Sequence, residues 1–143
     1  MKAAAFALAM MVAVTASNAQ SMAAEQGYFA DATKFEPALI GQAEKGYIDC
    51  LKSDNDGVVE SALAHVAMIK LALPARGFKE VELQIARLVK NAATPELRYK
   101  AYVTLVVMQH PEIFGSVAQG DYRGSDELFG AMSSRLCNYT SAR

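Results

Sequence analysis

Four side chains in this sequence are of the types that most often bind a metal ion or act as nucleophile and base. They are Cys50, His65, His110 and Cys137. None of them stands at the short spacings typical of zinc ligands, and neither cysteine belongs to a Cys-x-x-Cys pair or neighbours a histidine. The Gly-x-Ser-x-Gly motif and the glycine-rich phosphate-binding motifs are also missing from the sequence. We therefore expect no catalytic residues, no metal site and no cofactor, and we interpret the chain as a protein that is not an enzyme.

Residues 1–19 have the pattern of a cleavable secretory signal. Lys2 precedes an uncharged apolar run, Ala3–Ala16, which is short for a bilayer span, and Ser17–Ala19 supplies small residues of the kind that signal peptidase recognises. Small residues at Ala23 and Ala24 offer a competing cleavage site. We expect a periplasmic protein without a membrane-spanning segment. Its expected parts are a signal peptide (1–19), an N-terminal extension (20–34) and a helical domain (35–143).

The two cysteines have a structural interpretation in an exported protein. Because the compartment beyond the membrane is oxidising, we expect a disulfide between Cys50 and Cys137. This bond would join the last helix to the first and remove roughly 4–5 kcal/mol of unfolded-state freedom, according to the loop-entropy relation. Two separate thiols are the alternative that the sequence leaves open.

Side chains suited to protein recognition gather in the glycine-rich stretch 115–125. It contains Gln119, Asp121, Tyr122 and Arg123. Tyrosine and arginine often anchor interfaces because they combine a large contact area with several hydrogen bonds. A connection of this length in a compact domain is also more often functional than a short one. We interpret these four residues as partner-binding, with an ordinary flexible connection as the alternative.

Charge is unevenly distributed along the chain. Acidic residues exceed basic ones over 25–60, and basic residues exceed acidic ones over 70–100, although the whole chain has 14 basic and 15 acidic side chains. This near-neutral total gives no indication of a nucleic-acid partner. We interpret Asp54 and Asp56 as partner-binding residues that add electrostatic steering. A homodimer that joins the oppositely charged halves is a second interpretation, and two solvated faces of opposite sign are a third.

Helices are expected to position these residues, because the apolar side chains recur at three- and four-residue steps. Pro74 and Gly77 are typical of a helix end, and Thr94 followed by Pro95 is typical of a helix start. Strand signals are nearly absent, so the sequence predicts an all-α fold. The predicted helices cover 35–52, 56–73, 78–91, 94–110 and 126–138.

The helices also repeat with a period of about 38 residues. Residues 47–51 align with 85–89, and Val58 and Ala62 align with Leu97 and Ala101. The segment Thr94-Pro95-Glu96-Leu97-Arg98, followed by Ala101, resembles the second helix of HEAT and armadillo repeats; the first half lacks the proline and the arginine. The resemblance implies two antiparallel helix pairs, with the last helix as a cap.

An exported helical domain without catalytic residues resembles, in overall plan, the small periplasmic immunity proteins that neutralise amidase effectors of type VI secretion. The resemblance implies that the partner is a secreted peptidoglycan hydrolase and that the protein, commonly as a dimer, blocks the enzyme's active-site cleft. On this interpretation Asp121, Tyr122 and Arg123 contact the cleft.

Two other functions stay open at this point. A small-ligand carrier would enclose an apolar pocket lined by residues such as Tyr99, Tyr102, Met108 and Phe114. An adaptor protein of the cell envelope would bind a partner without inhibiting it.

Overall fold

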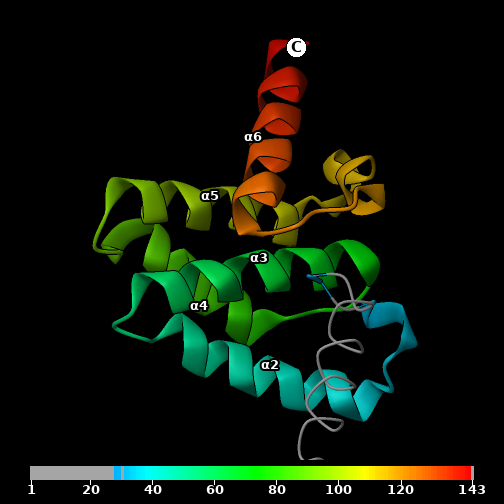
Figure 1. Ribbon diagram of the computed structural model, residues 1–143, viewed down its shortest axis with the longest axis vertical. Coiled ribbons are helices and arrows are strands. Elements are labelled where there is room, and N and C mark those ends of the chain that lie inside the picture. Colours follow the sequence, from blue (N-terminus) through cyan, green and yellow to red (C-terminus); the bar gives the residue numbers. More distant parts are fainter. Residues whose placement is uncertain (1–27, 30, 143) are drawn as a thin grey trace, which may run out of the picture.

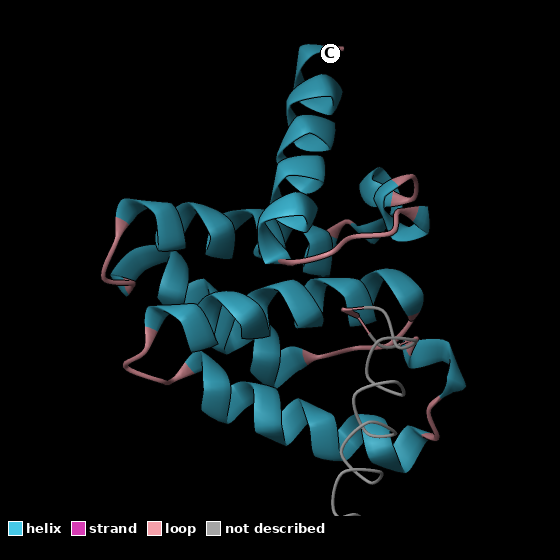
Figure 2. Cartoon of the chain, viewed as in Figure 1, coloured by secondary structure: helices cyan, strands magenta, loops and turns pink. Residues whose placement is uncertain are grey.

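The computed structural model describes residues 28–29 and 31–142 (Figure 1). The predicted signal peptide and most of the predicted N-terminal extension lie outside these residues. Every regular element in the described part is a helix (Figure 2), which confirms the predicted all-α fold. The longer helices are α2 (Pro37–Leu51), α3 (Asp56–Ala72), α4 (Lys79–Asn91), α5 (Pro95–Gln109) and α6 (Ser125–Ser141), and the short 3-10 helices are η1 (Ala32–Lys34), η2 (Pro111–Phe114) and η3 (Val117–Gln119).

Local sequence explains where these helices begin. The Asn55 side chain accepts hydrogen bonds from the backbone N–H groups of Gly57 (3.0 Å) and Val58 (3.3 Å), and so caps α3. Thr94 caps α5 in the same way, and Pro95 occupies the first helical position, where a missing N–H costs nothing. The predicted helix ends therefore agree closely with the observed ones, except that α6 continues to Ser141.

The helices stack as two pairs. Helices α2 and α3 form the first antiparallel pair and α4 and α5 the second, with α2 packed against α4 and α3 against α5 (Figure 1). Helix α3 is central, because it also contacts α6 and all three 3-10 helices. Its side chains are buried on several faces, among them Val59, Leu63, Val66 and Leu71. Such an apolar circumference is typical of a helix enclosed by others.

Helix α6 stands on this stack and extends beyond it (Figure 1). Its first half buries Leu128, Phe129 and Met132 against α3 and α5. Further along, the Arg135 Nε donates a hydrogen bond of 2.7 Å to the Ile113 carbonyl of η2. The last helix therefore covers part of the stack with one half and projects with the other.

The predicted disulfide is wrong for this structure, because Cys50 and Cys137 are both free. Cys50 is half-buried near the end of α2, and Cys137 is exposed on the projecting half of α6. Figure 1 places α2 and this end of α6 at opposite sides of the molecule. A disulfide requires Cα atoms within about 7 Å of each other, and the direction in which α6 leaves the stack prevents this.

Candidate functional site

The stretch 115–125 is folded onto the core and is not a loose connection. Phe114, directly before the stretch, and Val117 within it are buried among the core residues, and η3 forms one further turn. Gln119 and Asp121 are exposed beyond this anchor. Together with Arg123, which is also exposed, three of the four predicted contact residues in the stretch present their side chains to solvent from a supported backbone.

Tyr122 turns its hydroxyl inward. The hydroxyl donates a hydrogen bond of 2.9 Å to the Val117 carbonyl, which also accepts one of 3.1 Å from the Gly120 N–H. A Cβ atom at Gly120 would collide with the Tyr122 ring, so glycine is required for this close approach. Burial raises the pKa of Tyr122, because the phenolate would be less well solvated. The hydroxyl of Tyr122 is therefore occupied within the chain, and only the exposed part of its ring remains available to contact a partner.

Arg123 combines a fixed backbone with an exposed side chain. Its backbone N–H donates a hydrogen bond of 2.8 Å to a carboxylate oxygen of Glu127 in the first turn of α6. Within the described part of the chain, its guanidinium forms no ion pair. Arg123 is therefore the predicted contact residue best placed to meet an acidic group on a partner.

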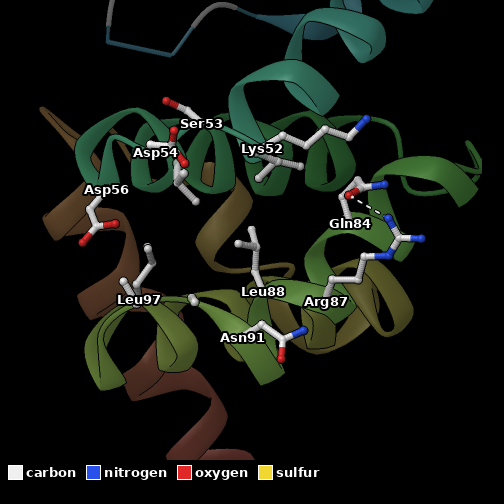
Figure 3. Close-up of a pocket in the computed structure, with 13 residues that line it drawn as sticks. Lys52, Ser53, Asp54, Asp56, Gln84, Arg87, Leu88, Asn91 and Leu97 are labelled. Carbon is white, nitrogen blue, oxygen red and sulfur yellow. Dashed lines mark hydrogen bonds between the residues drawn. The ribbon is translucent and has the colours of Figure 1, made fainter.

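Asp54 and Asp56 lie elsewhere, in a groove at the end of the stack where α3 and α5 begin (Figure 3). The loop residues instead follow the far end of α5 (Figure 1). The structure therefore does not bring the two predicted sets together. The groove has a volume of about 450 Å³ and lies between the α2–α3 turn, α4 and the start of α5.

The groove has an apolar floor and charged rims. Leu51, Val59, Leu88 and Leu97 line it, and three of these, Leu51, Val59 and Leu97, are buried. The polar and charged side chains around them are Lys52, Ser53, Asp54, Asp56, Gln84, Arg87 and Asn91 (Figure 3). The sequence pattern had indicated only the two aspartates, because the other members come from helices whose packing was not known.

Sequence reasoning also missed a lysine that joins three helices. Lys100 Nζ in α5 lies 3.0 Å from Glu60 Oε2 in α3, 3.0 Å from Glu96 Oε1, and 3.2 Å from Asp126 Oδ1 in α6. It also lies 5.5 Å from the centre of the Phe129 ring. The one signal for this cluster in the sequence was the four-residue spacing of Glu96 and Lys100, which allows an ion pair on the surface of a helix.

This arrangement changes the protonation of Lys100. Burial by itself lowers the pKa of the ammonium group, but the carboxylates of Glu96, Glu60 and Asp126 outweigh burial and raise the pKa above its usual range. Glu60 also accepts a hydrogen bond of 3.0 Å from the Ser125 hydroxyl at the start of α6. Lys100 is therefore a charged structural link that holds α6 on the stack, and not a candidate acid or base.

His65 is held within an aromatic cluster. Its Nδ1 lies 2.8 Å from the Ser61 carbonyl, which can only accept, so this nitrogen carries the proton. The rings of Phe29 and Tyr47 lie 4.9 and 6.2 Å from the imidazole centre. Cys50 lines a groove of about 410 Å³ that His65 also lines. No hydrogen bond joins this thiol and imidazole in the described structure, so they do not form a nucleophile and base pair.

Two further features of the described residues concern metal binding and membrane crossing. Over residues 28–29 and 31–142, no three histidine, cysteine, aspartate or glutamate side chains gather closely enough to bind a metal ion. None of the described helices combines the length and the apolar character that a membrane crossing requires.

The residues proposed to line an apolar pocket under the alternative carrier function are not grouped together. Tyr99 and Tyr102 are 47% and 46% exposed on the surface of α5, whereas Met108 and Phe114 are packed in the core. The four side chains therefore do not line a common cavity.

No protein-family model, curated protein or solved structure matches this chain.

Proposed function

We propose that the protein is a non-enzymatic binding module of the periplasm that recognises a partner protein through the stretch 115–125. The observation that carries this proposal is the internal fixation of the stretch, in which Tyr122 and Gly120 both bond to the Val117 carbonyl. A binding surface that is ordered before association loses less conformational entropy on binding. The exposed side chains of Asp121 and Arg123 offer charges of both signs for specific recognition.

In its most specific form, the proposal is that the partner is a secreted peptidoglycan amidase and that the bound stretch blocks its active-site cleft. Stacked helix pairs of a HEAT-like kind would serve as the rigid body that presents the stretch. The packing of α4 on α2 and of α5 on α3 supports this part of the proposal. An inhibitor needs a shape and charge that are complementary to the cleft, but no catalytic group of its own.

The test begins with the chain from Gln20 onward as bait for the protein encoded by the neighbouring reading frame and for periplasmic extract. We expect capture of a peptidoglycan hydrolase whose activity falls to zero at a fixed molar ratio of the two proteins. Arg123→Glu should weaken both capture and inhibition at least tenfold, because it places a carboxylate where the free guanidinium now lies.

Lys45→Glu is the matched control, since Lys45 is also exposed and free of ion pairs in the described part but lies on α2. It should leave inhibition unchanged. Equal inhibition by wild type and Arg123→Glu would show that stretch 115–125 is not the contact surface. Capture of a hydrolase that stays fully active would exclude the inhibitor and favour an adaptor.

A further inference from the structure

The groove at the start of α3 and α5 has a charge arrangement that the proposed function does not use. Asp54 and Asp56 lie on one side of it, and Lys52 and Arg87 lie on the other, with Leu88 on the floor between them (Figure 3). Lys52, Asp54 and Asp56 come from the end of α2, the α2–α3 turn and the start of α3, whereas Arg87 comes from α4. Both helix pairs therefore contribute charges to the groove. The stacking of the pairs therefore creates the groove.

These charges do not neutralise one another. None of the four charged side chains forms an ion pair with any residue in the described part of the chain. The Arg87 guanidinium donates a long hydrogen bond of 3.5 Å to the Gln84 side-chain oxygen. Opposite charges that face a common apolar floor without pairing are complementary to a ligand that carries both charges itself.

We propose that this groove binds a short peptide with free termini, with its ammonium group toward Asp54 and Asp56 and its carboxylate toward Lys52 and Arg87. An apolar side chain in the middle of the peptide would cover Leu88 and Leu97. A groove of about 450 Å³ falls within the range of about 300–1,000 Å³ that is usual for small-molecule sites. Arg87 suits the carboxylate because its guanidinium can form two parallel hydrogen bonds.

The ligand chemistry can be tested without altering the protein. Isothermal titration and amide chemical-shift mapping of the chain from Gln20 onward would use three probes, namely Ala-Leu-Ala with free termini, its N-acetylated form and its C-terminal amide. We expect the free peptide to shift the amides of residues 51–59 and 84–97. Each cap should weaken binding at least tenfold, because it removes one of the two terminal charges. A higher salt concentration should weaken binding only to the extent that it depends on attraction between opposite charges.

Protein variants then assign each charge to its side of the groove. Arg87→Gln should weaken binding of the free peptide at least tenfold. It should leave binding of the C-terminal amide unchanged, since that probe has no carboxylate to lose. The double variant Asp54→Asn, Asp56→Asn should likewise weaken binding of the free peptide at least tenfold. It should leave binding of the N-acetylated probe unchanged, since that probe has no ammonium group to lose. Arg123→Gln is the matched control on stretch 115–125, and it should not alter peptide binding.

Three results would overturn this inference. Equal affinity for the free and the capped peptides would show that the groove does not recognise the terminal charges of the peptide. Amide shifts confined to residues outside the groove would place the peptide elsewhere. Equal or tighter binding of N-acetyl-Lys-Leu-Glu-amide would assign the groove to an internal segment of a protein chain instead of a free peptide. Because Arg123 lies outside the groove, the peptide result and the inhibition result can fail separately.

Discussion

Replacing Lys100 with methionine would test whether a single ammonium group holds α6 on the stacked pairs. Methionine keeps much of the length and apolar character of the lysine stem, so packing against Phe129 is largely retained. What is lost is the charge shared by Glu60, Glu96 and Asp126. Three carboxylates would then face one another at the junction of α3, α5 and α6.

The burial of each carboxylate sets the size of the expected effect. The Lys100 side chain is only 9% exposed, whereas its partners are 26% (Glu60), 75% (Glu96) and 88% (Asp126) exposed. A hydrogen bond between a charged donor and a partly buried acceptor contributes about 1.5 kcal/mol, and each exposed pair adds only about 0.3 kcal/mol. We expect the free energy of unfolding to fall by about 2 kcal/mol, dominated by Glu60.

Thermal and urea unfolding followed by circular dichroism measure this loss. For a domain of this size we expect Tm to fall by roughly 8 °C. Lys45→Met, at an exposed mid-helix position without an ion pair among the described residues, is the matched control and should change the free energy of unfolding by less than about 0.5 kcal/mol. A double-mutant cycle should give a larger coupling with Glu60→Gln than with Asp126→Asn. Equal couplings, or an unchanged Tm in Lys100→Met, would refute the assignment.

The pH dependence of the same pair of proteins gives an independent check. The pKa of Lys100 is raised in the folded state, so its contribution to stability is complete below the unfolded lysine pKa of about 10.4 and is lost as pH rises through the folded value. The stability difference between wild type and Lys100→Met should therefore be constant from pH 7 to 9 and shrink above about pH 10.4. A difference that grows with alkaline pH would contradict the raised pKa.

Three shorter predictions concern the loop, the thiols and a helix cap. Tyr122→Phe should cost about 1 kcal/mol and speed amide exchange in stretch 115–125, because it removes the inward hydrogen bond, while Tyr99→Phe on the exposed face of α5 should change neither. Titration with a thiol reagent after denaturation without reductant should find both Cys50 and Cys137 reactive, and reductant should leave Tm unchanged; one blocked pair per chain would show that they are bridged. Asn55→Ala should lower the free energy of unfolding by about 1 kcal/mol through loss of the α3 cap, and an unchanged urea midpoint would show that the cap contributes nothing.

The helices could be predicted from sequence because their signals are local. The step of the apolar residues, the cap at Thr94 and the proline at Pro95 act within one or two turns, so α5 begins where the sequence indicates. The identification of Asp121 and Arg123 as exposed candidates also rested on local composition. The inward turn of Tyr122 did not follow, since it depends on the close approach of the ring to Gly120.

By itself, the sequence determined the all-α class, most of the helix boundaries and the lack of a recognisable catalytic motif, because each depends on residues near one another in the chain. The tertiary structure alone decided which distant residues meet. It separated Cys50 from Cys137 by directing the end of α6 away from the stack. It also brought Glu60 and Asp126 to Lys100, and Asp54 to the same groove as Arg87. Those meetings depend on how helix faces pack together, which a linear pattern of residue types does not encode.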